Sequence, residues 1–481
     1  MHSLAKYHRL NRRAFLHDGS AGVASIALSH LLAADGLLAD TNQRHPLERR
    51  AGHFIPRAKR LLVIFCNGGV SQVDSWDYKP ELEKRHDQPH PETGKLIAFQ
   101  STAGNLKKSY YKFRPRGTSG KMVSDMLPRL AGLADWKCFL HGMVARSNSH
   151  GPAEIQMSTG SVTDGFPSAG AWVSYALGSE NDNLPGFVCM PDPRGGSQAG
   201  GNLWGNGFLP ASFQGTRMSS THPVQNLLVP EGISPAGDRA ALRILQRLNE
   251  QHLARDPGNS ELRGRIASYE LAARMQLKVP DLMNLNRETT TTISAYGADS
   301  SNRDKAAYAR NCILARRLLE KGVRVVQVIN GTNELGTGNG NWDGHKELVE
   351  QYKVHVDIFD QPTTALLLDL NQRGLLDDTL VLWLTEFGRM PMFQGGSTGR
   401  DHNPYGFTIW LAGAGVKSPF SFGATDEFGF RAIENPTSVA DLYATVLHLM
   451  GLDHRKLDYS HNGTRRRLSD PDGQVIQQIL A

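Results

Sequence analysis

Two adjacent side chains that could bind a metal ion, Asp401 and His402, lie between a glycine and an apolar run typical of a β-strand. Carboxylate and imidazole groups are common ligands of divalent metals. Two further segments carry such groups next to strand-like runs, with Asp343 and His345 in WDGH and Glu386 in TEFGR. We expect each segment to follow its own strand, and such positions converge outside the carboxyl ends of the strands of an α/β sheet. Together they predict one metal site.

A structural network is the competing interpretation of these residues. Arg389 and Arg400 lie in the same segments as the acids, and guanidinium groups pair readily with carboxylates. A single Asp-x-His pair is a weak signal, because surface Asp and His are common. Three such segments are more specific, and they favour the metal site.

A second candidate for chemistry is the segment SNSHGP, residues 147–152, which we expect to open a helix that ends at Gly160. Free N–H groups and the helix dipole favour negative charge at a helix N-terminus, so Ser149 and His150 could contact an anion or act in catalysis. The alternative is plain capping by Ser or Asn, with proline in the first turn.

The apolar pattern predicts the elements that carry these residues. Continuous apolar runs of strand length indicate strands buried on both faces, hence a mostly parallel sheet with helices on both faces. We expect strands at 60–66, 138–144, 324–329, 379–384 and 408–411, and helices at 149–159, 304–321, 346–373 and 438–450.

Residues 194–300 look like an insertion in this α/β pattern. The part from 194 to 230 is rich in Gly, Pro, Ser and Asn, and 238–276 has a helical pattern with many charges. We expect the insertion to lie over the sheet as a lid that shapes a substrate pocket, although a structural arm is equally compatible.

Length and composition exclude several classes of protein. A chain of 481 residues with 40% hydrophobic residues can form one large α/β domain, which we place at residues 45–475. The net charge of +6 is small, and the run Arg465–Arg467 is too short for a nucleic-acid surface, so no nucleic-acid partner is expected. Four widely spaced cysteines exclude a disulfide framework.

Residues 1–40 look like an export leader. Arg12 and Arg13 are followed by Phe-Leu within three residues and then by a moderately apolar stretch at 21–38, and the segment resembles a twin-arginine (Tat) signal. His30 and Asp35 interrupt the stretch, so no stable membrane span is expected. The resemblance implies the Tat machinery as a partner and a periplasmic or extracellular location. An amphipathic N-terminal helix is the alternative.

The rest of the chain resembles the bacterial family called domain of unknown function 1501. The resemblance rests on seven motifs in chain order: NGGVSQVDSWDYKPEL, GAWVSYALGSENDNLPGFV, ILARRLLEKGVRVVQV, WDGH, DDTLVLWLTEFGRMP, GRDHNPYGF and SVADLYATVLHLMGLD. The family is Tat-exported and sulfatase-like, and it is similar to the alkaline phosphatase superfamily. This implies that superfamily's fold and hydrolysis of phosphate or sulfate esters with one or two divalent metals.

The resemblance also implies roles for single residues. Asp343, His345 and His402 match the ligands of one metal site, and Glu386 takes the place of an Asp in a strand-end ligand motif. The acidic ligand after the first strand falls at Asn67, with Asp74 as a stand-in.

Three departures from the superfamily pattern argue against a second metal site and against a sulfatase nucleophile. Phe387 replaces the second ligand of the strand-end motif, and Asn67 replaces an acidic ligand. The nucleophile position falls near Ser149, where no Cys-x-Pro-x-Arg is present. A formylglycine sulfatase is therefore disfavoured, and Ser149 is the candidate nucleophile.

These observations predict an exported hydrolase that uses a divalent metal (Zn, Ca or Mn) on an anionic ester, such as a sulfated or phosphorylated polysaccharide. Two alternatives remain open. One is a catalytically degenerate, sulfatase-like binding protein that keeps at most one metal. The other is a structural component of the envelope, which would leave the acidic and imidazole residues near the strands unexplained.

Overall fold

A nine-stranded sheet forms the centre of the computed structural model, which describes residues 46–92, 99, 102–221, 232–256, 259–333, 340–469 and 473–481. Eight strands follow one another in the order β14-β5-β13-β9-β1-β8-β6-β7, and β17 also pairs with β5. Their bounds are β14 Phe420–Phe422, β5 Lys137–Val144, β13 Phe407–Gly413, β9 Thr379–Leu384, β1 Arg60–Cys66, β8 Val325–Asn330, β6 Phe187–Met190, β7 Thr216–Arg217 and β17 Thr437–Ser438.

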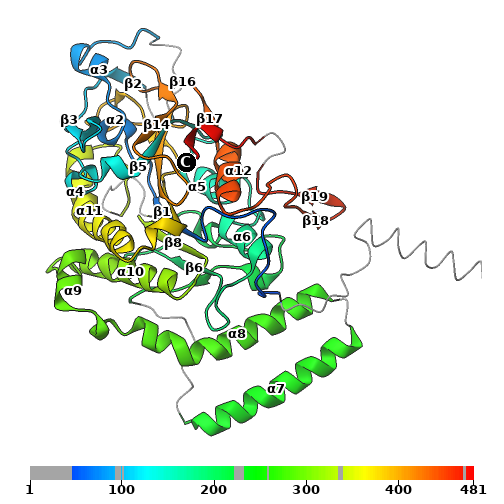
Figure 1. Ribbon diagram of the computed structural model, residues 1–481. Helices are drawn as coiled ribbons and strands as arrows, with labels where there is room; N and C mark the ends of the chain where they lie inside the picture. Colours follow the sequence, from blue (N-terminus) through cyan, green and yellow to red (C-terminus); the bar gives the residue numbers. More distant parts are fainter. Residues whose placement is uncertain are drawn as a thin grey trace, which may run out of the picture.

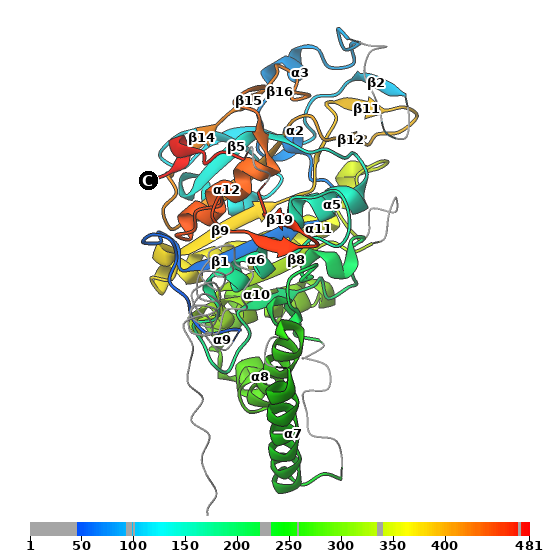
Figure 2. The ribbon, with the colours of Figure 1, turned by 90° about the vertical axis from the view of Figure 1, so that its right-hand side faces the viewer.

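The sheet is mostly parallel, which confirms the predicted fold class. β1 pairs in parallel with β8 and β9, and β8 pairs in parallel with β6. Every residue of β8 and β9 is buried, as their continuous apolar runs require. Helices α10 (Arg303–Glu320) and α11 (Leu348–Gln372) lie on one face, and α5 (His150–Thr159), α6 (Ala169–Leu177) and α12 (Val439–Leu449) lie on the other (Figures 1 and 2).

Strand β13 runs antiparallel to both of its neighbours, β5 and β9. Asp401 and His402 therefore precede their strand, and the expectation that each ligand segment follows its own strand is wrong for this one. The start of an antiparallel strand lies at the same sheet edge as the carboxyl ends of the parallel strands. Because β13 is reversed, this segment lies at the end of the sheet where the carboxyl ends of β1, β8 and β9 meet.

The predicted insertion contains the helices α7 (Pro235–Arg255) and α8 (Ser260–Met283). Figure 1 shows α7 as the outermost helix, with α8 between it and the sheet. The segment before these helices packs beside the site helix α5, where Ala199 N donates a hydrogen bond of 2.7 Å to Glu154 Oε2. The function of the insertion as a lid stays a prediction.

Smaller elements complete the described chain. They are α2 Gln72–Ser75, α3 Pro80–Lys84, α4 Pro128–Ala131, α9 Thr290–Tyr296, β2 Ala103–Leu106, β3 Phe113–Arg116, β4 Lys121–Ser124, β10 Gly388–Arg389, β11 Met392–Gln394, β12 His402–Asn403, β15 Ala424–Thr425, β16 Ala432–Glu434, β18 Tyr459–His461 and β19 Thr464–Arg466. All four cysteines are buried free thiols. Within the described part of the chain, no helix combines the length and apolar character needed to cross a membrane.

Candidate metal centre

Four side chains that can ligate a metal converge beyond the sheet edge: His150, Asp343, His345 and His402. One ligand atom from each lies within 4.8 Å of the others, and each residue is exposed by 5% or less. His150 is the first residue of α5, Asp343 and His345 lie in the segment between β8 and α11, and His402 begins β12. The structure thus brings together three predicted ligands, Asp343, His345 and His402. The fourth group is His150, which was predicted to lie at a helix N-terminus.

The carboxylate of Asp343 is the centre of the cluster. Its Oδ1 lies 2.9 Å from His345 Nε2, 3.2 Å from His150 Nε2 and 3.3 Å from His402 Nε2. The Nε2 atoms of His345 and His402 are only 2.8 Å apart. Three imidazole nitrogens and one carboxylate oxygen therefore share one small volume.

The outer nitrogen of each imidazole has an oxygen partner. The Nδ1 distances are 2.6 Å from His150 to Glu386 Oε1, 2.5 Å from His345 to Gln394 Oε1 and 2.6 Å from His402 to the carbonyl of Asn148. In a neutral imidazole whose Nδ1 proton is accepted by a carboxylate or carbonyl oxygen, the Nε2 lone pair is free to ligate a metal. Lone pairs as close as those of His345 and His402 repel unless a proton or a cation lies between them. This arrangement fits a bound cation.

Charge is balanced around the centre by the fully buried Arg389, whose Nη2 lies 2.6 Å from Asp343 Oδ1. Burial alone would raise the pKa of Asp343, but Arg389 and the hydrogen-bonding histidines hold that pKa well below its usual range. Burial lowers the pKa of His150, whereas Asp343 and Glu386 outweigh burial and raise it to about 9. Burial holds the pKa of His402 well below its ordinary value. Asp343 is thus an anion ready to ligate a cation.

Beside the cluster, the buried side chain of Asn67 has no hydrogen-bond partner among the described residues at either of its two polar atoms. Asn67 directly follows β1 and lies next to the segment of Asp343, because its carbonyl accepts a hydrogen bond of 2.9 Å from Trp342 N. Gly68, with φ +109°, permits this approach, since a Cβ there would lie 2.6 Å from Asp343 N. A buried polar atom without a partner is costly, so the side chain of Asn67 supports the fit of a ligand.

Aromatic rings enclose the imidazoles. Phe387 lies with its centroid 4.5 Å from that of His402 and 4.9 Å from that of His150. Phe99 stacks on His402 at 4.8 Å. Apolar walls exclude water and strengthen electrostatic interactions inside the site. The position where the resemblance implied a second metal ligand is therefore occupied by a packing residue.

Two predicted ligands have other partners in the structure. Asp74 pairs with the buried Arg400, with 2.8 Å from Oδ2 to Nε, and Asp401 accepts hydrogen bonds of 2.8 Å from the backbone N–H groups of His402 and Phe99. The competing interpretation, in which arginines pair with the acids, thus describes Asp74, and Arg389 pairs with Asp343 as well. Ser149 is the half-buried N-cap residue of α5, and its side chain makes no capping bond.

Two contributors to the centre were not identified from the sequence, and Glu386, predicted as a metal ligand, has a different role. Gln394 and the carbonyl of Asn148 anchor histidines, and Glu386 accepts from His150 and from Gly68 N, at 2.8 Å, rather than pointing a free carboxylate into the cluster. A backbone carbonyl carries no sequence signal. Gln394 lies eight residues after Glu386, and no sequence pattern distinguishes it.

The fold and the centre define an α/β protein with a buried His3Asp cluster at the edge of a mostly parallel sheet. The chain belongs to the family described as "Protein of unknown function (DUF1501)", whose model matches residues 58–480. This confirms the family resemblance seen in the motifs. A comparison with curated proteins found no match.

Similar solved structures include a synthase, a sulfatase and an alkaline phosphatase. They include the lipoteichoic acid synthase LtaP from Listeria monocytogenes, with 9% identity, 89% of this chain and 79% of that chain covered, and a TM-score of 0.37. The PsFucS1 sulfatase from Pseudoalteromonas sp. has 14% identity, coverage of 82% and 68%, and a TM-score of 0.35. A TAB5 alkaline phosphatase mutant has 9% identity, coverage of 83% and 99%, and a TM-score of 0.33.

Proposed function

We propose that this protein is a metal-dependent hydrolase of phosphate or sulfate esters that acts outside the cytoplasm. The observation that carries the proposal is the orientation of the three imidazoles. Each has its outer nitrogen bound to an oxygen, and their inner nitrogens converge on Asp343 Oδ1. Metal-binding histidines have this pattern of outer hydrogen bonds.

The residues that would hold the cation are His150, Asp343, His345 and His402. Three nitrogen donors with one carboxylate fit Zn, and also Mn, better than Ca, which prefers a shell made of oxygens alone. A divalent cation in this place would act as a Lewis acid toward an ester oxygen.

The chain's own residues prepare the site for an anion. Glu386 fixes the ring of His150, and Arg389 keeps Asp343 ionised inside an apolar enclosure. The N-terminal N–H groups of α5 add partial positive charge beside His150. We propose Ser149, its neighbour in the chain, as the residue that contacts or attacks the ester. A sulfated or phosphorylated polysaccharide is the substrate class that we propose.

A degenerate binding protein is the second candidate. Phe387 packs against His150 and His402 at the position implied for a second metal ligand, which favours a centre with a single cation. In this alternative the protein binds an anionic ligand and turns nothing over. The two functions share the cation and differ in hydrolysis.

Elemental analysis of the purified protein is the first test. We expect about one equivalent of Zn or Mn in the wild type and its loss in Asp343→Ala and His402→Ala. Asp401→Asn is the matched control, because Asp401 neighbours His402 and accepts hydrogen bonds from the backbone N–H groups of His402 and Phe99. If the wild type takes up no cation even from excess Zn or Mn, the proposal fails.

Turnover of p-nitrophenyl phosphate and p-nitrophenyl sulfate then separates the two candidate functions. A hydrolase loses activity in His402→Ala and keeps it in Asp401→Asn. Metal binding without hydrolysis of either ester, together with saturable binding of phosphate or sulfate, would identify the degenerate binding protein.

We also propose that residues 1–40, which lie outside the described residues, direct export by the Tat machinery. Changing Arg12 and Arg13 together to Lys should keep the protein in the cytoplasm, as seen by cell fractionation. Changing the nearby Lys6 to Arg should leave export intact. Export of the twin-lysine variant at the wild-type level would contradict this proposal.

A further inference from the structure

Helix α7 has an apolar face that nothing in the described structure covers. None of its described side chains is buried, whereas its neighbour α8 buries Ala267, Leu271 and Met275. On α7, Ile244 is 61% exposed, Leu245 42% and Leu248 56%. Large apolar side chains grouped on one exposed helix mark an interaction surface more often than an ordinary solvated face.

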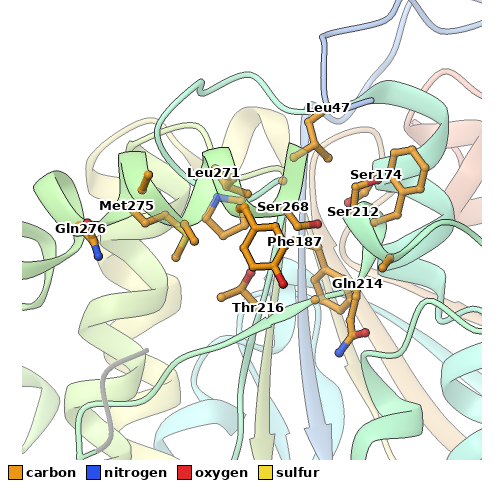
Figure 3. A pocket seen from close by; sticks show the side chains of 18 of the residues that line it. Leu47, Ser174, Phe187, Ser212, Gln214, Thr216, Ser268, Leu271, Met275 and Gln276 are labelled. Atoms are coloured by element: carbon orange, nitrogen blue, oxygen red, sulfur yellow. The ribbon is translucent and has the colours of Figure 1, made fainter. Parts of the chain in front are cut away.

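This face continues into a cleft between the two helices and the body of the protein. The cleft has a volume of about 410 Å³, and Leu245 is both part of its lining and part of the exposed face. Figure 3 shows Leu271 and Met275 of α8 and Phe187 of β6 among the residues that line it. The apolar surface of α7 is therefore larger than the three exposed side chains alone.

The spacing of residues on α7 is that of a seam between two helices. Residues 238, 241, 245, 248, 252 and 255 alternate at intervals of three and four, which is the heptad pattern of helices that pack along their length. The middle of this seam is apolar, with Ala241, Leu245 and Leu248. Its two ends carry opposite charges, Asp238 in the first turn and Arg255 in the last turn.

We propose that α7 pairs antiparallel with α7 of a second copy of this chain, so that two helical hairpins form a four-helix interface. A two-fold axis between residues 246 and 247 places Leu245 opposite Leu248 of the partner subunit. The same axis places Asp238 opposite Arg255 of the partner subunit. One register thus pairs the two leucines with each other and the acid with the base, and the symmetry axis repeats both pairs.

Charge selects the antiparallel orientation. In a parallel pair with the same seam, Asp238 would meet Asp238 of the partner subunit, and Arg255 would meet Arg255 of the partner subunit. Like charges in contact oppose association. Among the described residues, neither Asp238 nor Arg255 forms an ion pair within its own chain, so both are available to the second copy.

The mass of the purified protein in solution, measured by sedimentation, tests the proposal. We expect a dimer for the wild type and a monomer for Leu245→Glu/Leu248→Glu. Arg243→Glu, which lies on the opposite side of α7, changes the net charge by the same amount and should stay dimeric. Equal helical content by circular dichroism in all variants shows that they fold. A monomeric wild type, or a dimeric double-glutamate variant, would overturn the proposal.

Charge exchange tests the orientation. Asp238→Arg alone and Arg255→Asp alone should each weaken the dimer, and Asp238→Arg/Arg255→Asp should restore it, because the double variant pairs with itself. Cysteines at positions 245 and 248 together should form a cross-link between subunits, since the four natural cysteines are buried. Failure of the double exchange to restore the dimer would overturn the antiparallel register.

Discussion

The Nε2 atoms of His345 and His402 lie 2.8 Å apart, although 57 residues separate the two histidines in the chain. Both rings are held from outside, His345 by Gln394 and His402 by the carbonyl of Asn148. Neither ring can turn away without losing a hydrogen bond. The protein therefore holds two nitrogen ligands at a separation that a cation stabilises.

Removal of the cation should destabilise the fold. A ligand that binds only the folded state adds about 2.7 kcal/mol of stability at a free concentration 100 times its Kd. Dialysis against EDTA should lower the melting temperature of the wild type, and added Zn or Mn should restore it. His345→Ala should melt at one temperature with or without EDTA. An EDTA-insensitive wild type that contains metal would contradict this prediction.

Glu386 should set the affinity of the centre without being a ligand. It accepts hydrogen bonds from His150 Nδ1 and from Gly68 N, so Glu386→Gln should weaken metal binding by about 10- to 100-fold. Competition with a chromogenic chelator measures this change. The matched control is Glu347→Gln, because Glu347 is an exposed residue beyond His345. Unchanged affinity in Glu386→Gln would show that the ring of His150 needs no support from this carboxylate.

Much of the framework could be predicted because its signals are local. The parallel strands β1, β8 and β9 are buried on both faces, so their continuous apolar runs identify them directly. β6 was not predicted, because a strand of only four residues, Phe187–Met190, gives a weak apolar pattern. The direction of β13 could not be predicted, because it depends on its pairing with β5 and β9.

Those ligands of the candidate site that lie near strand ends were predicted from the sequence. They are Asp343, His345 and His402. His150 joins them because α5 starts at this edge of the sheet, and its sequence context indicated an anion contact instead. The roles of the other predicted ligands depend on long-range pairing. Asp74, for example, pairs with Arg400, which lies 326 residues later in the chain. No local pattern distinguishes such a paired acid from a free ligand.

Arg389 should be essential for stability as well as for the charge of the site. It is fully buried, pairs with Asp343 and donates hydrogen bonds to the carbonyls of Gly69 and Arg400. Arg389→Met removes the guanidinium partner of a buried carboxylate and should cost about 3–5 kcal/mol in urea unfolding. Arg431→Met, which removes an exposed pair with Glu92, should cost no more than about 1 kcal/mol. Similar costs for the two variants would refute this assignment.

Lys137 should make stability depend on pH. Burial lowers the pKa of Lys137 to about 7 from 10.5, although its Nζ donates hydrogen bonds to the carbonyls of Leu130 and Leu133. Between these two pKa values the unfolded chain binds a proton here that the folded protein lacks. Stability from this group therefore rises with pH, by up to about 1.4 kcal/mol per unit, and is lost as pH falls toward 7.

Lys137→Met removes this titration and provides the comparison. The free energy of unfolding of the wild type, minus that of Lys137→Met, should grow between about pH 7 and pH 9. The same difference for Lys456→Met, a change at an exposed lysine, should stay flat. A flat difference for Lys137→Met would mean that the ammonium group keeps its proton in the folded protein. The carbonyls of Leu130 and Leu133 would then stabilise the charge in place of water.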